Sequence, residues 1–323
     1  MSVPGEALRT ALVLGGTGDQ GWPQVVRLAR QGWRVRAAGR TTARVAAAVA
    51  DAPELAAAAR ARIVATAVDH ADADSLARAV DGADVVLANY PSSSLHDGGA
   101  LVTAAERLGA AAACAGIGLV VLNTSLPLPA RPLGFRAQDV RFAQRDALRA
   151  SGVPTISIQP VVYMDNLLRG WAYPSIADRD TFEYPHSPTL EVSWLCQDDL
   201  AALMCAAAER PQLAGRDIAV GGPEVLRGPD VARLLSRASG REIRFVSQLV
   251  DAFAERMRAV FARDASLDAD ALTGELARIY RWYNEAPEKP FRVDMAPVLR
   301  ELPVQLTTFA EWAARQRWNR SGG

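Results

Sequence analysis

Lysine is nearly absent from this chain. Of its 36 basic residues, 35 are arginine, and Lys289 is the sole lysine. A P-loop needs a lysine behind its glycines, so the N-terminal half holds no P-loop. A Tyr-x-x-x-Lys pair is also excluded, because residue 285, four places before Lys289, is a glutamate. Any catalytic lysine would have to come from the C-terminal region.

An excess of positive charge is missing as well. The 36 basic residues are balanced by 36 acidic residues, so the formal net charge of the 323-residue chain is zero. Nucleic-acid binding proteins need a basic surplus to replace phosphate counterions. The composition therefore argues against a nucleic-acid partner.

Cysteine, histidine and long apolar runs are also scarce. The three cysteines form no C-x-x-C motif, which favours reduced thiols in a cytoplasmic protein. The three histidines are scattered and predict no metal site. Residues 1–8 lack the apolar run of a signal peptide. The longest uncharged stretch, 108–130, contains Gly116 and Gly118 and predicts a helix end and a buried strand rather than a membrane span.

Short apolar runs alternate with helical patterns through the first half of the chain. The runs cover residues 8–14, 34–38, 62–68, 84–88, 119–122 and 155–159. Helical spacing is clearest over 21–31 and 138–150. This alternation predicts an α/β fold with a doubly wound parallel sheet of the Rossmann type, and the continuous Val and Leu runs indicate strands that are covered on both faces.

The pattern changes after Pro160. Residues 163–188 are rich in aromatic residues and proline, and helices are expected at 198–209, 229–239, 251–263 and 272–282, with one more strand at 217–220. No flexible linker separates the halves. We therefore expect a nucleotide-binding domain over 1–160 and a smaller α/β substrate-capping region over 161–323, with the chain crossing back to the sheet.

A glycine loop follows the first predicted strand. Gly15, Gly18 and Gly21 have the spacing G-x-x-G-x-x-G between that strand and a helix. Such a loop allows a tight turn and brings a pyrophosphate to the helix N-terminus. The loop residues expected to bind the cofactor are Gly15, Thr17, Gly18, Asp19, Gln20 and Gly21. A plain glycine-rich turn is the alternative.

The second strand selects the form of the cofactor. An NAD site places an acid about 20 residues after the glycines, but no acid occurs between Asp19 and Asp51. Arg40, assisted by Arg44, is suited to a 2′-phosphate through charge-assisted hydrogen bonds. The sequence therefore predicts NADP(H), although a solvated arginine is the alternative for Arg40.

These motifs together resemble the NmrA-like branch of the atypical short-chain dehydrogenase/reductases. The resemblance extends over most of the chain and includes the glycine loop, Arg40, the segments 151–155 and 159–166, and the closing segment 307–312. It implies that Asp69, after the third strand, lies near the adenine. It also implies an NADP-dependent oxidoreductase.

The resemblance fails at one catalytic position. Related isoflavone-reductase-like enzymes keep a lysine near the start of the helix before the sixth strand, and this chain has Arg141 at about that place. Arginine keeps its charge but does not donate a proton at neutral pH. Two interpretations stay open: a reductase with unconventional proton transfer, and a protein that binds NADPH without turnover.

Three strand ends should converge on the nicotinamide, because ligands of such folds bind beyond the carboxyl ends of the strands. Asn89 and Tyr90 end the fourth strand, Ser125 follows the fifth, and Tyr163 follows the sixth. We predict catalytic roles for Ser125 and Tyr163, cofactor contacts for Asn89 and Tyr90, and substrate contacts for Tyr90 and Tyr163. The alternatives are that Ser125 is an ordinary hydroxyl at a strand end and that Tyr163 and Tyr90 are packed wall residues.

The capping region adds further candidates. Its dense aromatic residues suggest a flat substrate held by Trp171 and Trp194, with a catalytic role for His186 because histidine exchanges protons near neutral pH. A core between the two halves is the alternative for these residues.

The sequence thus favours an NADPH-dependent reductase of a flat or conjugated small molecule of the quinone, imine or enone type. Such acceptors take up hydride readily and demand little beyond positioning. The Arg-rich and Ala-rich composition suggests a high-GC bacterial genome, where such enzymes often serve specialised metabolism. The alternatives are an NADP(H)-sensing regulator that acts through protein partners and a cofactor-bound protein without net redox change; a homodimer is left open.

Overall fold

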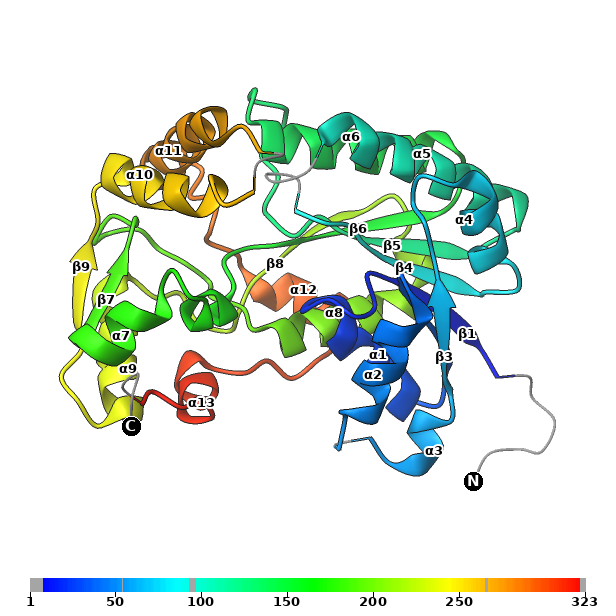
Figure 1. The fold of residues 1–323 in the computed structure, drawn as a ribbon, viewed down its shortest axis with the longest axis horizontal. Helices are drawn as coiled ribbons and strands as arrows, with labels where there is room; N and C mark the ends of the chain where they lie inside the picture. Colours follow the sequence, from blue (N-terminus) through cyan, green and yellow to red (C-terminus); the bar gives the residue numbers. More distant parts are fainter. Residues whose placement is uncertain (1–7, 54, 93–96, 265–266, 320–323) are drawn as a thin grey trace.

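A seven-stranded parallel sheet forms the centre of the molecule in the computed structural model, which describes residues 8–53, 55–92, 97–264 and 267–319 (Figure 1). The strand order is β3-β2-β1-β4-β5-β6-β8. The strands are β1 (Thr10–Leu14), β2 (Arg34–Gly39), β3 (Ile63–Ala67), β4 (Val85–Asn89), β5 (Leu119–Asn123), β6 (Thr155–Pro160) and β8 (Asp217–Val220). Every residue of β1, β4, β5 and β6 is buried, as the uninterrupted apolar runs predict. The predicted doubly wound α/β fold is confirmed.

Helices cover both faces of the sheet (Figure 1). On one face lie α4 (Ala73–Val80), α5 (Gly98–Cys114) and α6 (Arg136–Ala150), and their residues Leu76, Leu108 and Leu148 share a core with β1 and β5. The other face is covered by α1 (Gly21–Arg30), α2 (Thr42–Ala50), α3 (Ala57–Arg60), α8 (Gln197–Ala208) and α12 (Met295–Glu301). None of the described helices is long and apolar enough to cross a membrane.

The chain returns to the sheet after residue 160. Strand β8 pairs in parallel with β6, through Ile158 and Ile218 among others. Helix α8 packs against α1 and contributes Leu200 and Leu203 to the core beneath the sheet. The sheet layer therefore contains segments from both halves of the sequence, as Figure 1 shows.

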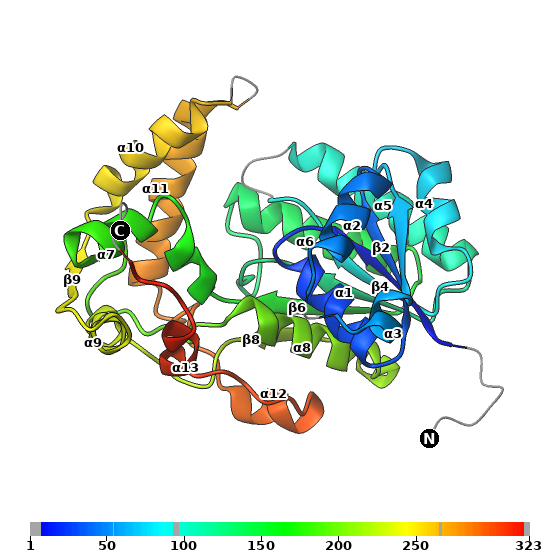
Figure 2. The ribbon, with the colours of Figure 1, turned by 60° about the horizontal axis from the view of Figure 1, so that its bottom comes forward.

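The remaining elements form a second body beside the carboxyl ends of the strands (Figure 2). They are η1 (Met164–Leu168), α7 (Tyr173–Arg179), β7 (Thr181–Tyr184), α9 (Gly228–Ser239), β9 (Arg244–Ser247), α10 (Val250–Phe261), α11 (Ala269–Glu285) and α13 (Phe309–Ala314). The short η2 (Pro211–Leu213) lies instead beside α8, and its Leu213 belongs to the core beneath the sheet. The parallel pair β7–β9 was not predicted. An aromatic core that includes Phe182, Tyr184 and Trp194 holds this body together.

Candidate active site

The glycine loop is closed by backbone contacts that leave no space for a side chain at Gly15 or Gly21. Gly15 has a φ of +67°, and a Cβ there would lie 2.7 Å from the Asn89 carbonyl oxygen. A Cβ on Gly21 would lie only 2.3 Å from the Gly15 carbonyl oxygen. The Gly18 amide donates to that same oxygen at 2.9 Å. The loop thus turns tightly and opens directly into the N-terminus of α1, as the predicted phosphate site requires.

A cleft of about 630 Å³ runs over this loop. Its lining includes the predicted residues Gly15, Thr17, Gly18, Asp19, Gln20, Gly21, Arg40, Arg44, Asn89 and Tyr90. Asp69 is not among the lining residues. Its carboxylate instead accepts a hydrogen bond from the Ala71 amide at 2.8 Å, while the neighbouring Val68 and His70 face the cleft. The Asp69 side chain therefore orders the turn before α4, and the cleft is lined by its two neighbours in sequence instead.

The charges around the cleft suit a phosphorylated dinucleotide. Arg40 and Arg44 are exposed at one end of it. Asp19, in the loop, forms an ion pair with Arg169, which also lines the cleft. This pairing offsets the negative charge that Asp19 would otherwise present to a pyrophosphate. The residues present therefore fit NADP(H).

A chain of amide side chains ties the ends of β4 and β5 to the glycine loop. Gln24 donates to the Asn89 Oδ1 at 2.9 Å, and Asn123 donates to that oxygen at 3.0 Å. Asn123 and the Ser125 hydroxyl both donate to the Gln20 Oε1, at 2.6 and 3.0 Å. Ser125 adopts a φ of +62°, a strained conformation for a residue with a side chain. The network fixes Ser125 at the junction of strand ends and loop.

Gln24 and Asn123 were not predicted to belong to the site. Both side chains are fully buried and hydrogen-bonded. Gln24 lies among apolar residues on the inner face of α1. Because a buried amide needs a hydrogen-bond partner, a glutamine at such a position predicts a polar contact in the interior.

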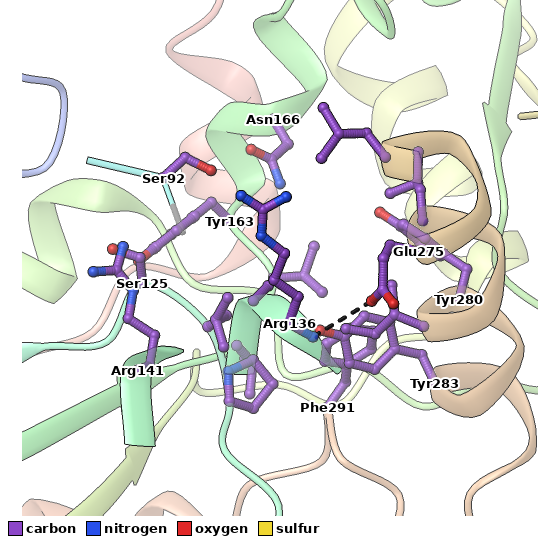
Figure 3. Close-up of a pocket in the computed structure, with 18 of the residues that line it drawn as sticks. Ser92, Ser125, Arg136, Arg141, Tyr163, Asn166, Glu275, Tyr280, Tyr283 and Phe291 are labelled. Carbon is purple, nitrogen blue, oxygen red and sulfur yellow. Dashed lines mark hydrogen bonds between the residues drawn. The ribbon is translucent and has the colours of Figure 1, made fainter. Parts of the chain in front are cut away.

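A second cavity of about 410 Å³ adjoins the cofactor cleft (Figure 3). Gln20, Tyr90, Ser92, Tyr163 and Asn166 line both, so the two spaces meet at these residues. Its far wall is aromatic, formed by residues that include Tyr184, Tyr280, Tyr283 and Phe291. A flat molecule is the natural occupant of such a space.

Tyr163 lies where the cavity and the cleft meet. Its side chain is buried, and its hydroxyl has no hydrogen-bond partner among the described residues. Burial raises the pKa of Tyr163 well above its ordinary value, and the positive charge of Arg141 opposes that rise. At neutral pH the hydroxyl is therefore a protonated donor. Tyr90 is buried beside it, and burial raises the pKa of Tyr90 as well.

Arg141 also lines the cavity, and its side chain is fully buried. Its Nη1 donates to the Gln144 Oε1 at 2.7 Å, and its Nη2 donates to the Pro91 carbonyl oxygen at 2.6 Å. Burial lowers the pKa of Arg141 to about 10, while Tyr163 and Tyr90 act in the opposite direction. The side chain keeps its charge at neutral pH and lies near the tyrosines, as Figure 3 shows for Tyr163.

The aromatic candidates Trp171, Trp194 and His186 do not line the cavity. Trp194 and His186 are almost fully buried in the aromatic core, and Trp171 packs against it beside Tyr184 and Phe253. Burial lowers the pKa of His186 to about 3, so it is neutral and remote from proton transfer. The expectation of substrate contacts and catalysis for these three residues is corrected: they fill the core behind the wall.

Comparison with known proteins supports this assignment of the fold and the cleft. The model of the NmrA-like family matches residues 8–313. The chain belongs to the NmrA-like family. It is 30% identical over 261 residues to an NAD(P)H azoreductase of Xenophilus azovorans, covering 80% of this chain and 84% of that protein. The resemblance implied by the sequence motifs is thus confirmed.

Two solved structures illustrate the range of this fold. An NADPH-dependent quinone oxidoreductase of Escherichia coli complexed with NADPH has a TM-score of 0.69 at 19% identity and covers 94% of this chain and 98% of its own. NmrA, a negative transcriptional regulator in complex with NADP, has a TM-score of 0.70 at 18% identity, and the match covers 96% of this chain and 95% of NmrA. At these identities the likeness concerns the fold.

Proposed function

We propose that this protein is an NADPH-dependent reductase of flat, conjugated small molecules. The observation that carries the proposal is the meeting of the cofactor cleft with an aromatic-walled cavity at Tyr163, a buried hydroxyl without a partner among the described residues. A protein that only bound the dinucleotide would not need a second cavity beside the cofactor cleft.

The cleft residues hold the cofactor. The loop from Gly15 to Gly21 offers backbone amides to the pyrophosphate, and Arg40 with Arg44 binds the 2′-phosphate; both arginines line the cleft, which supports this role. When bound, NADPH supplies the hydride for the reduction. The azoreductase and the quinone oxidoreductase named above support this cofactor and this class of reaction.

The cavity residues position the acceptor. The aromatic wall holds a flat ring system and excludes water, so much of the rate enhancement comes from orientation. Ser125, whose hydroxyl donates to the Gln20 Oε1, lines the same cavity, and its oxygen is available to accept a hydrogen bond from the bound molecule. Quinone, azo, imine and enone acceptors fit these demands because they need little activation.

Tyr163 supplies the proton in this proposal. Its protonated hydroxyl donates to the heteroatom that gains electrons, and the nearby Arg141 charge stabilises the phenolate that is left. Arg141 thus provides the electrostatic part of the missing lysine's role, while proton donation rests with the tyrosine.

The test is NADPH oxidation by purified protein with a quinone, an azo dye and a cyclic enone. We expect turnover with at least one acceptor, and a loss of about 10²-fold or more in kcat for the enone in Tyr163→Phe, because general acid catalysis contributes that much. Tyr173→Phe is the matched control, since the Tyr173 hydroxyl donates to the Arg317 carbonyl oxygen outside the cavity.

The alternative of a cofactor-sensing regulator makes the opposite prediction. Tight NADPH binding without oxidation across the acceptors, in both the parent protein and Tyr163→Phe, would contradict the reductase and favour a regulator.

A further inference from the structure

Arg141 retains hydrogen-bonding capacity that its described contacts do not use. Of the five N–H donors of a guanidinium, its Nη1 and Nη2 each engage one neutral oxygen, of Gln144 and of Pro91. Its Nε is buried and has no partner among the described residues. Since Arg141 lines the cavity, its positive charge lies at the cavity wall.

The positive charge of Arg141 lacks a counter-charge bonded to it within the described chain. Amide and carbonyl oxygens satisfy donors but do not neutralise a charge, and an uncompensated buried charge is costly. The cavity has one acidic lining residue, Glu275, set against Arg136 and Arg141. The Glu275 carboxylate already accepts from Arg278 at 2.6 Å and from the Arg136 backbone amide at 3.4 Å. The lining residues therefore include two arginines and one glutamate.

We propose that the substrates of this cavity are conjugated acids, and that Arg141 binds their carboxylate or an equivalent oxyanionic group. The inference rests on the proposed reductase function and narrows its substrate class. A planar guanidinium matches a carboxylate in geometry and charge, which a lysine at the same place would not do as well. A bound anion would supply the counter-charge that Arg141 lacks.

The shape of the cavity orients such an acid. In Figure 3 Arg141 lies beside Ser125 and Tyr163 at one end, while Tyr280 and Tyr283 project from α11 at the other. A ring against the aromatic wall would direct its carboxylate toward Arg141, close to the hydroxyls of Ser125 and Tyr163. The anionic group would then share the Arg141 charge with the phenolate that Tyr163 leaves after proton transfer.

Binding of a matched pair of non-reducible probes tests this proposal. With NADP⁺ at saturation, 2-naphthoate and its neutral analogue 2-naphthamide are titrated into the protein by calorimetry. We expect the carboxylate to bind at least about tenfold more tightly, because charge-assisted hydrogen bonds are stronger than neutral ones. Equal affinities, tighter binding of the amide, or no binding of either probe would overturn the proposal.

Variants on α6 assign the effect to one residue. Arg141→Gln should abolish the preference for the carboxylate. Arg149→Gln is the matched control, because Arg149 bonds Asp217 outside the cavity and should keep the preference. Loss of the preference in Arg136→Gln instead of Arg141→Gln would contradict the assignment. If Arg141→Gln does not fold, Arg141→Lys tests the same point. It should retain only part of the preference for 2-naphthoate over 2-naphthamide. An unchanged preference would contradict a role for the guanidinium group.

The probes are not reduced, so their result is independent of turnover. Carboxylate preference without NADPH oxidation would support the anion site and contradict the reductase. Oxidation of NADPH by neutral acceptors, with no carboxylate preference in binding, would support the reductase and overturn the anion site.

Discussion

Arg40 and Arg44 stand exposed at the end of the cofactor cleft, where neither contributes to the core. Substitutions of Arg40 and Arg44 should therefore affect folding little, so they can test the proposed contact with the 2′-phosphate. No acid occurs between Asp19 and Asp51, so nothing in this segment offers an acceptor to a ribose 2′-hydroxyl as NAD sites do.

Arg40→Asp should weaken the preference for NADPH over NADH. We expect NADPH affinity to fall by at least about tenfold, because a hydrogen bond to a charged group is lost and a like charge is introduced. NADH affinity should change little. Fluorescence titration of both nucleotides measures this, with Arg237→Asp on the exposed face of α9 as control. Equal losses for both nucleotides would contradict the role of Arg40.

His186 illustrates a residue whose chemistry is suppressed by its surroundings. Its ring packs within 4.5 Å of the Tyr184 ring centroid and near those of Trp194 and Phe291. Its Nε2 is buried without a partner among the described residues. Protonation would place a charge in this core, which is why the pKa falls to about 3.

This burial predicts a loss of stability in acid. The folded pKa is about 3 and the ordinary value is 6.5, so the unfolded chain binds the proton first as the pH falls. The contribution of neutral His186 to the free energy of unfolding is fully present above pH 6.5. It declines by about 1.4 kcal/mol per pH unit between pH 6 and 4. Urea unfolding of the parent and of His186→Phe measures it. Parallel pH profiles of the two proteins would refute the prediction.

The turn from β1 into α1 and the interior of α11 use glycine for opposite reasons. Gly21 is needed because a Cβ would meet the Gly15 carbonyl oxygen at 2.3 Å. Gly274 lies in α11 with nothing within 4 Å of a Cβ. Gly21 allows two backbone segments to approach closely, whereas Gly274 only weakens α11.

A pair of alanine substitutions should separate these two uses. Gly21→Ala should destabilise the protein by about 1–3 kcal/mol through overpacking and weaken NADPH binding. Gly274→Ala should stabilise it by about 0.5–1 kcal/mol. Thermal and urea unfolding measure both. Stabilisation by Gly21→Ala, or a loss of stability in Gly274→Ala, would contradict this interpretation.

Strands of the central sheet were predictable because each is a continuous apolar run. Predicted strands at 34–38 and 84–88 agree with β2 and β4 within one residue at either end. The pair β7–β9 was missed because each strand has four residues and the partners lie about 60 residues apart in sequence. Their pairing depends on contacts that no local pattern reports.

The two halves of the sequence depend on each other for a covered sheet. The core beneath the sheet combines Val25 and Leu28 of α1 with Leu200 and Leu203 of α8, and β8 closes the edge beside β6. Removal of residues 161–323 would expose this apolar surface and the edge of β6 to solvent.

A chain that ends at residue 160 should therefore not fold into a monomeric nucleotide-binding unit. We expect it to aggregate, and to bind NADPH far more weakly than the full chain. Size-exclusion chromatography and NADPH titration of the two proteins test this. A monomeric 1–160 fragment with full NADPH affinity would show that the first half is an independent domain.

Local pattern was enough for the sheet, the glycine loop and the identity of the cofactor, because each depends on neighbours in sequence: apolar runs, glycine spacing and an arginine after a strand. The identity of the cavity wall required contacts between distant segments. Arg141 bonds the Pro91 carbonyl oxygen 50 residues away, and Ser125 bonds Gln20 across 105 residues. Such contacts determined which aromatic residues fill the core, which face the cavity, and which arginine was left with a buried charge. Burial and charge compensation are properties of packing, so the folded molecule alone distinguishes Tyr163 and Arg141 from Trp194 and His186.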